Sequence, residues 1–155
     1  MYTATESDPS VLIREFLVGS SVSGVRFGAP QLLFSPASGS DEVFINLLSV
    51  FQVFAVRPMM FPANEADVPE QTQEEEILAL FDLRGVEVAD AEIVRPAGHL
   101  AVTFVNGAVL YVNGSNSGPE PWHVGLNAND RSETTWIIAL TGDEPLVFRP
   151  FSSER

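Results

Sequence analysis

The sequence contains no cysteine and no lysine among its 155 residues. The absence of cysteine excludes disulfide bonds and thiol chemistry, and it removes the usual soft ligands of structural zinc. All eight basic residues are arginine, and only two histidines are present. A zinc or iron centre, or a histidine base, therefore has few residues to draw on.

Long apolar runs are also absent. The longest, Val43–Val56, is interrupted by Asn46, Ser49 and Gln52 and is too short to cross a bilayer. The N-terminal stretch MYTATESDPS carries no basic residue, so we expect no secretory signal. Hydrophobic residues make up 45% of the chain, which favours a folded domain. We therefore expect a cytoplasmic protein without a membrane partner.

The charge is the most unusual property of the chain. Its 21 acidic and eight basic residues give a formal net charge of −13. Such acidity serves solubility or a salty cytoplasm, complements a basic partner, or mimics nucleic acid. Direct binding of nucleic acid is disfavoured, because no basic stripe with interleaved aromatic residues is present.

Capping signals predict two short helices. Residues 1–7 are expected to form a frayed tail, and Asp8 and Pro9 then fit the N-cap and first position of a helix that ends near Gly19. Its apolar residues recur at helical spacing: Leu12, Ile13, Phe16 and Leu17.

The second helix is predicted from Thr72, which together with Glu75 has the spacing of a capping box. Gly85 is its expected C-terminal glycine. Its predicted buried stripe consists of Ile77, Leu78, Leu80 and Phe81.

Turn residues divide the rest of the chain into predicted strands. Gly142-Asp143 is expected to be a turn, and Glu42–Phe54 is expected to hold two strands or one long bent strand. The other predicted strands are Ser21–Phe27, Gln31–Phe34, Val86–Val94, Pro119–Leu126, Thr134–Leu140 and Leu146–Phe148.

The strongest structural signal is Gly98–Val112, GHLAVTFVNGAVLYV. Asn106-Gly107 favours a two-residue type I′ hairpin turn, which would pair Phe104 with Val109 and Val102 with Tyr111. Both faces of this hairpin are mostly apolar, so we expect it to be covered on each side.

The two halves of the chain resemble each other. Leu17-Val18-Gly19 followed by Val22 matches Leu83-Arg84-Gly85 followed by Val88 at an offset of 66 residues, and each stretch lies between a helix and a series of strands. We therefore predict a single α+β domain of mostly antiparallel sheet with two short helices. Its two pseudo-repeats would span residues 8–57 and 72–150, joined by a proline-rich acidic connection at 58–71.

Catalytic motifs are scarce. His99 and His123 lack the spacing of a metal site or a catalytic triad, and no phosphate-binding loop is present. Asp90 and Glu92 share a face of a predicted strand, either as an acid/base pair or as a solvated face. We expect no cofactor, no metal and no catalytic residue.

One acidic constellation is suggestive. Six carboxylates within twelve residues repel one another and would gain from a cationic partner, although three of them also suit a helix N-terminus. Trp122 is a further candidate for a partner-binding surface, with a core position as the alternative. The six acidic residues are Glu65, Asp67, Glu70, Glu74, Glu75 and Glu76.

The hairpin GHLAVTFVNGAVLYV, with Glu120-Pro121-Trp122 and Gly142-Asp143-Glu144 after it, resembles a family of small uncharacterised bacterial proteins common in actinobacteria. Their pattern is a leucine-glycine helix end, a G-x-L-x-V-x-F-x-N/D-G hairpin, a Y-E-x-W strand and a terminal G-G-E. The resemblance covers Leu78–Phe148. Pro121 interrupts the E–W step here, and Gly142-Asp143 replaces the paired glycines.

The resemblance supplies no catalytic residues. Related small acidic α+β proteins resemble immunity proteins encoded beside polymorphic toxins, which implies a basic protein partner, such as a toxin domain. Our leading hypothesis is accordingly a non-enzymatic, immunity- or inhibitor-like factor with an acidic binding face. The alternatives are an enzyme or small-ligand protein with a pocket near His99 or His123, and a structural homodimer.

Overall fold

The computed structural model describes residues 2–5, 8–28, 30–36, 42–115, 118, 120–127, 135–140 and 143–150. The helices are α1 (Pro9–Leu17), the 3₁₀ helix η1 (Glu65–Asp67) and α2 (Gln73–Phe81). The strands are β1 (Tyr2–Thr5), β2 (Ser21–Arg26), β3 (Gln31–Ser35), β4 (Glu42–Leu47), β5 (Phe51–Phe54), β6 (Val88–Val94), β7 (His99–Phe104), β8 (Val109–Val112), β9 (Trp122–Asn127), β10 (Thr135–Leu140) and β11 (Asp143–Pro150).

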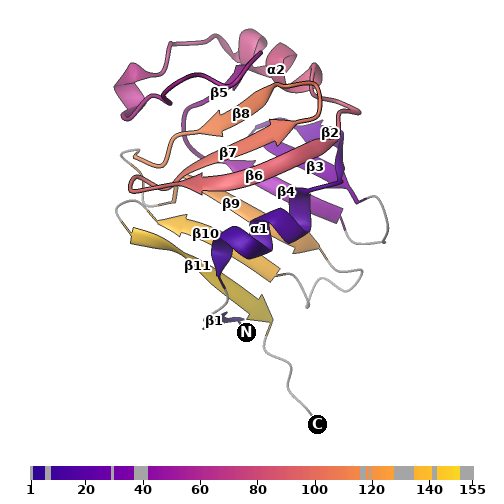
Figure 1. Ribbon diagram of the computed structural model, residues 1–155, viewed down its shortest axis with the longest axis vertical. Coiled ribbons are helices and arrows are strands. Elements are labelled where there is room, and N and C mark those ends of the chain that lie inside the picture. The colour runs from indigo at the N-terminus through magenta and orange to yellow at the C-terminus, as the bar shows by residue number, and fades with distance from the viewer. Residues whose placement is uncertain are drawn as a thin grey trace.

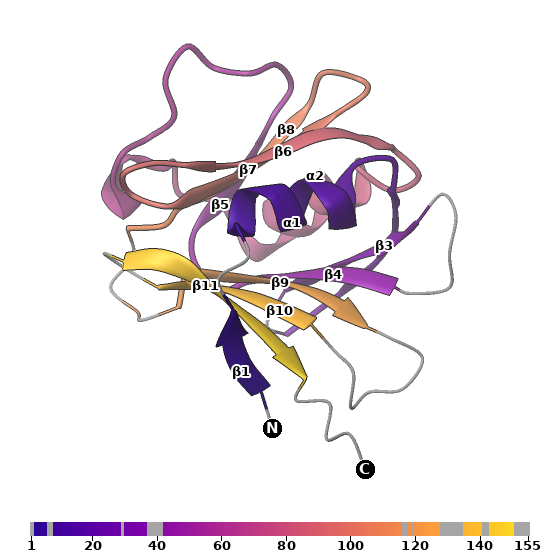
Figure 2. The same ribbon diagram turned by 60° about the horizontal axis from the view of Figure 1, so that its bottom comes forward.

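The strands form two antiparallel sheets (Figure 1). The large sheet has the order β1-β11-β10-β9-β4-β3-β2, and the small sheet has the order β5-β8-β7-β6. Figure 2 shows α1 and α2 between the two sheets. One hydrophobic core joins side chains from both helices and both sheets. The prediction of an α+β fold with mostly antiparallel sheet is therefore confirmed.

The helix caps follow the local sequence. Asp8 accepts a hydrogen bond from the Ser10 amide at 2.9 Å, and Pro9 occupies the first position of α1. At α2, Thr72 Oγ1 accepts from the Glu75 amide at 3.1 Å, and Glu75 Oε1 accepts from the Thr72 amide at 3.4 Å. These contacts satisfy backbone donors that a helix leaves unpaired at its start. Both predicted helices are confirmed.

The chain before α1 is not wholly a frayed tail. Tyr2–Thr5 pair antiparallel with β11, from Tyr2 opposite Pro150 to Thr5 opposite Val147. The prediction is wrong for these four residues. Strand pairing there depends on β11, which is remote in sequence and gives no local signal.

The hairpin between β7 and β8 has a different turn from the predicted one. The Gly107 amide donates to Phe104 O, and the Phe104 amide donates to Ala108 O, both at 2.9 Å. Gly107 has φ of +91°, whereas no described non-glycine residue has a positive φ. This pattern is a type I turn followed by a left-handed glycine, which uses three loop residues instead of two.

The longer loop shifts the register by one residue, so that Val102 lies opposite Leu110 and the predicted pairing is wrong. A shift of one residue exchanges the faces on one strand of a hairpin. The face toward the core carries Leu100, Val102, Phe104, Ala108, Leu110 and Val112. The opposite face is also buried at Ala101, Val109 and Tyr111, so both faces are covered, as predicted.

Backbone hydrogen bonds between the two halves repeat at the offset of 66 residues. The Gly19 amide donates to Val88 O at 3.0 Å, and the Gly85 amide donates to Val22 O at 2.8 Å. Both glycines have a positive φ, +86° and +81°. A second pair of bonds has the same relation: the Val88 amide to Ser20 O and the Val22 amide to Val86 O.

The strand order repeats in the same way. β9-β4-β3-β2 in the large sheet corresponds to β5-β8-β7-β6 in the small sheet, so the last strand of each unit joins the sheet of the other. The large sheet then continues through β10, β11 and β1, whereas the small sheet ends at β5. The duplication of the sequence stays a prediction. The reciprocal hydrogen bonds and the matching strand orders nevertheless relate the two units by a pseudo-two-fold axis.

The buried stripe predicted for α2 is wrong at two of its four residues. Leu78 and Phe81 are 63% and 40% exposed, whereas Leu12, which corresponds to Leu78 at the offset of 66, is only 6% exposed. The physical reason is the unequal extent of the sheets. α1 lies beside both β6 and β11, and the small sheet has no strand that corresponds to β11.

This asymmetry predicts unequal effects of one substitution at the two related positions. Leu12→Ala should lower the free energy of unfolding by about 2–4 kcal/mol, because it leaves a cavity in the core. Leu78→Ala should lower it by less than about 1 kcal/mol, because the side chain is mostly in water. Urea unfolding followed by tryptophan fluorescence measures both values. Equal losses would contradict the packing described for α2.

A glycine in the large sheet makes room for an aromatic ring. A Cβ atom at Gly125 would lie 2.0 Å from Cζ of Phe44, which is 2% exposed on the neighbouring strand. Gly125→Ala should therefore lower the free energy of unfolding by about 1–3 kcal/mol through overpacking. Gly24→Ala is the control, since its Cβ would meet Leu33 at an ordinary 3.6 Å. Thermal and urea unfolding of both variants test this, and the prediction fails if Gly125→Ala is no less stable than the control.

Candidate functional site

A cleft lies between η1, the chain that follows it, the first turn of α2 and the start of β5. Its volume is about 740 Å³. Glu65, Glu70 and Glu76 line it together with Gln71 and the apolar wall residue Phe51. We call this cavity the acidic cleft. It brings together three of the six acidic residues that the sequence predicted as partner-binding.

The η1 turn positions the first of these carboxylates. Asp67 Oδ2 accepts hydrogen bonds from the backbone amide and the side-chain amide of Asn64, at 3.3 and 3.2 Å. Val68 is 8% exposed and fixes the end of the turn against the interior. Asp67 therefore stabilises the local turn, and Glu65 lines the acidic cleft.

The first turn of α2 positions another carboxylate. Glu75 closes the capping box with Thr72, and Glu74 is exposed outside the residues that line the acidic cleft. Glu76 lines the cleft, where partial burial raises the pKa of its carboxyl above the ordinary value. The helix N-terminus favours negative charge nearby, which is consistent with acidic residues at all three positions.

The polar atoms of the acidic cleft are mainly acceptors. Among the described residues, Glu70 and Glu76 form no ion pair with an arginine. The Oε1 atom of Gln71 is buried and has no hydrogen-bond partner in the described structure. A buried acceptor without a donor carries a desolvation cost, and neighbouring carboxylates repel one another. A cationic hydrogen-bond donor would relieve both costs.

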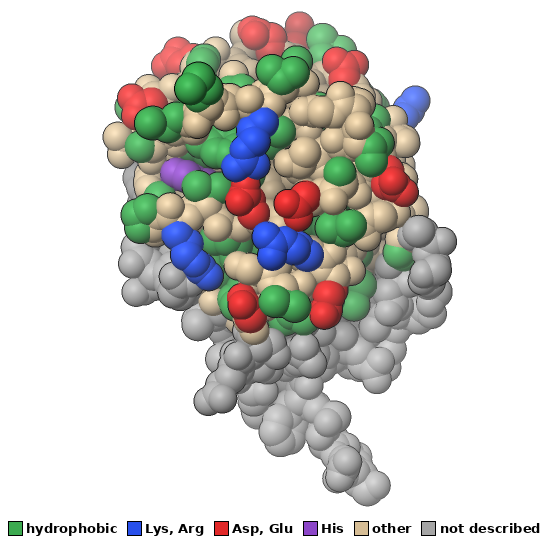
Figure 3. All heavy atoms as spheres, in the orientation of Figure 1, with side chains coloured by type: hydrophobic (Ala, Val, Ile, Leu, Met, Phe, Trp, Pro, Cys, Tyr) green, Lys and Arg blue, Asp and Glu red, His purple; other side chains and the backbone are tan. Residues whose placement is uncertain are grey.

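Acidic side chains are distributed unevenly over the surface. Figure 3 shows them along the upper edge of the molecule, where Figure 1 places α2 and the connection before it. At the centre of the same face, arginine and acidic side chains lie next to one another. The upper edge is thus the part of this face where negative charge is least neutralised by arginine.

Trp122 does not belong to a partner-binding surface. Its side chain is fully buried in the core, and its Nε1 donates a hydrogen bond to Gly98 O at 2.9 Å. The prediction that it contributes to the binding site is wrong. Trp122 belongs to the core and therefore lies on the inner face of the large sheet, and the alternation of side chains along β9 places His123 on the outer face.

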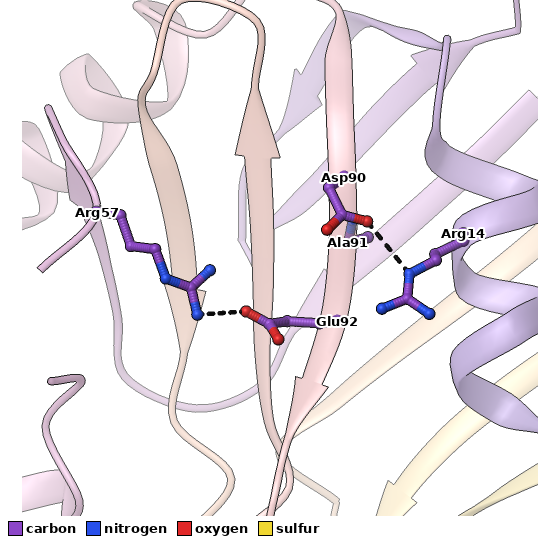
Figure 4. Close-up of polar contacts among 5 residues, drawn as sticks. All are labelled: Arg14, Arg57, Asp90, Ala91 and Glu92. Atoms are coloured by element: carbon purple, nitrogen blue, oxygen red, sulfur yellow. Dashed lines mark hydrogen bonds and ion pairs between the residues drawn. The ribbon is translucent and has the colours of Figure 1, made fainter. Parts of the chain in front are cut away.

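The carboxylates of β6 are engaged with arginines. Arg14 Nε lies 3.2 Å from Asp90 Oδ1, and Arg57 lies 2.5 Å from Glu92 Oε1. Figure 4 shows the two arginines approaching the strand from opposite sides. These ion pairs are partly exposed, so they contribute little to stability, but they neutralise the carboxylates. Asp90 and Glu92 therefore form surface ion pairs on β6.

The two histidines lie on different sheets. His99 at the start of β7 is 4% exposed, and its Nδ1 accepts a hydrogen bond from the Gly114 amide at 2.8 Å. Burial lowers the pKa of His99 below its ordinary value. On β9, His123 Nε2 lies 2.9 Å from Glu120 Oε2, and its Nδ1 lies 3.2 Å from Asn46 Nδ2. Neither histidine lines the acidic cleft.

Sequence reasoning missed several residues of the acidic cleft. Gln71 lies inside the acidic segment but gave no signal of its own, and Phe51 comes from β5, about twenty positions earlier. Only the fold brings this strand next to η1 and α2. A polar residue between charged ones and an aromatic residue in a strand are both too common to mark a site.

In the described ranges, no group of three or more histidine, aspartate or glutamate side chains is placed to hold a metal ion. No helix among the described residues is long and apolar enough to cross a membrane.

Comparison of the chain with protein-family models, curated proteins and solved structures finds no match in any of the three. The family resemblance of the hairpin region therefore stays an expectation from the sequence, and the function is argued from the acidic cleft.

The buried His99 predicts a pH effect on stability. Its pKa is lower in the folded state, so the unfolded chain takes up a proton at higher pH than the folded chain does. This contribution to stability is complete above the unfolded pKa, about 6.5, and is lost as the pH falls toward the folded pKa. Between about pH 7 and pH 5, the wild type should lose more unfolding free energy than His99→Gln. Urea unfolding across this range gives the slope of unfolding free energy against pH for each protein. Identical slopes would contradict a lowered pKa of His99 in the folded state.

Proposed function

We propose that this protein is a non-enzymatic interaction factor of the immunity or inhibitor type. It acts in the cytoplasm and binds a basic protein, such as a toxin domain, through the acidic cleft. The observation that carries this proposal is the convergence of Glu65, Glu70 and Glu76 on one cavity with the unpartnered acceptor of Gln71. Among the described residues Glu70 and Glu76 have no arginine partner, and carboxylates of this kind form their strongest hydrogen bonds with cationic donors.

The chemistry of the acidic cleft favours arginine or lysine as the side chain that enters it. An arginine presents five donors in a planar fork and can bond two acceptors at once. Glu70 and Glu76 both line this cavity, so two carboxylates lie around one guanidinium that enters it. Because Glu76 is partly buried, its attraction to a cation is screened less than that of a fully exposed carboxylate.

The charge of the whole chain supports the same proposal. The net charge of −13 produces a long-range potential that attracts a basic protein and repels acidic ones. Such a field mainly increases the association rate, and it weakens as salt rises. The overall charge thus explains encounter, and the acidic cleft explains where the partner binds.

The test is affinity capture from the lysate of the source organism with three immobilised proteins. The wild type and the Glu15→Gln/Glu87→Gln control should retain one dominant basic protein. The Glu70→Gln/Glu76→Gln variant should bind it at least about tenfold more weakly, because two charges that face the partner are removed. The control removes the same charge from exposed positions outside the acidic cleft.

Salt provides the second readout of this experiment. The retained protein should be released at about 1 M salt, where the Debye length is about 3 Å. Equal retention by the cleft variant, or retention that salt does not change, would overturn the proposed function. The absence of any retained protein on all three columns would also count against it.

A further inference from the structure

A second cavity adjoins the acidic cleft. Its volume is about 240 Å³, and it lies between the end of β2 and α2. Val25, Ile77 and Leu80 supply apolar walls, and Phe51 and Glu76 line both this cavity and the acidic cleft. A cavity of this size and lining accepts one large apolar side chain. The two cavities are therefore neighbouring subsites separated by shared walls.

Phe27, which lines the second cavity, belongs to a group of exposed apolar side chains that continues onto α2. Phe27, Leu78 and Phe81 are 55%, 63% and 40% exposed, and the rings of Phe27 and Phe81 lie 5.9 Å apart. Leu78 and Phe81 share a face of α2 because they are three residues apart. We call these three residues the apolar strip. Contiguous exposed apolar side chains of this kind mark interaction surfaces more often than isolated ones do.

The pseudo-symmetry shows that the exposure of Phe27 and Leu78 is specific to one side of the molecule. Leu12 and Ile93 correspond to Leu78 and Phe27 at the offset of 66, and they are only 6% and 8% exposed. The continuation of the large sheet through β10 and β11 covers the α1 side. The small sheet ends at β5, so the related side chains on the α2 side have no such cover.

We propose that the apolar strip and the second cavity bind the same partner as the acidic cleft, and that the partner presents a segment with an apolar side chain next to a basic one. This inference rests on the proposed function and adds the chemistry of the partner segment. The basic side chain occupies the acidic cleft, and the apolar side chain passes Phe51 into the second cavity. Continuity of the two subsites through Phe51 and Glu76 carries the argument.

Charge complementarity selects this occupant over a second copy of the chain. The strip lies beside Glu74 and Glu76, and a symmetric dimer through it would bring two such acidic rims together. Like charges at an interface oppose association. A basic segment instead neutralises the rim while its apolar side chains cover the strip.

The experiment uses two fluorescein-labelled peptides of eight residues and equal charge, one alternating arginine with leucine and the other alternating arginine with serine. Fluorescence anisotropy at low salt measures their dissociation constants. The wild type should bind the arginine–leucine peptide at least about tenfold more tightly, because burial of one large apolar side chain is worth about that factor.

Two variants test which residues cause the difference in affinity between the two peptides. Phe27→Ser/Leu78→Ser should reduce the preference for leucine to about twofold or less and leave binding of the arginine–serine peptide unchanged. Val56→Ser/Val105→Ser is the matched control, since these valines are 73% and 59% exposed and lie outside the strip. All four positions are more than half exposed, so the variants should fold. The control should keep the full preference.

The outcomes separate this inference from the proposed function. Equal affinity of the wild type for both peptides, or no binding of either, overturns the inference about the apolar strip. Binding of both peptides that Glu70→Gln/Glu76→Gln leaves unchanged overturns the role of the acidic cleft instead. Sedimentation equilibrium tests the remaining occupant: a wild-type dimer that Phe27→Ser/Leu78→Ser turns into a monomer would assign the strip to self-association.

Discussion

The arrangement of the whole molecule depends on four backbone hydrogen bonds between residues 19–22 and 85–88. These bonds link the edge of the large sheet to the edge of the small sheet near the ends of both helices. The left-handed backbone at Gly19 and Gly85 turns each chain from its helix into this pairing. Because the sheets are joined here, α1 and α2 are enclosed between them and one core serves both units (Figure 2). The pairing thus fixes which face of each helix is buried and which is exposed.

The candidate site arises where the two related units differ. After β9 the chain continues the large sheet, but after β5 it leaves the small sheet and crosses its outer face. Phe61 stacks on Tyr111 with 5.2 Å between ring centres, and the Tyr111 hydroxyl donates to Pro62 O. These contacts hold the connection in place and deliver η1 and the acidic residues to the start of α2. Because the chain leaves the small sheet after β5, no further strand covers α2. The acidic cleft and the apolar strip therefore both result from the early end of the small sheet.

Local signals in the sequence predicted most elements correctly. Both helices follow from their caps, and the acidic segment was identified because its charges are consecutive. Features that depend on distant contacts were not predictable. The pairing of β1 needs β11, the burial of Trp122 needs the facing sheet, and the exposure of Leu78 and Phe81 needs the early end of the small sheet. The hairpin register failed for a different reason: Asn106-Gly107 suits either a two-residue loop or a three-residue loop with a left-handed glycine, and the packing of the core face selects between them.

The proposed function requires a basic ligand to bind at the junction of η1, α2 and β5. The most direct test is an NMR titration of the protein labelled with ¹⁵N, using the arginine–leucine peptide and following the backbone amide shifts. The account predicts that the largest shift changes fall on residues 64–81, with Phe27 and Phe51, and that they saturate together. Shift changes centred on Asp90, Glu92 and the outer face of the small sheet would contradict it, because the ligand would then compete with Arg14 and Arg57 at a different acidic surface.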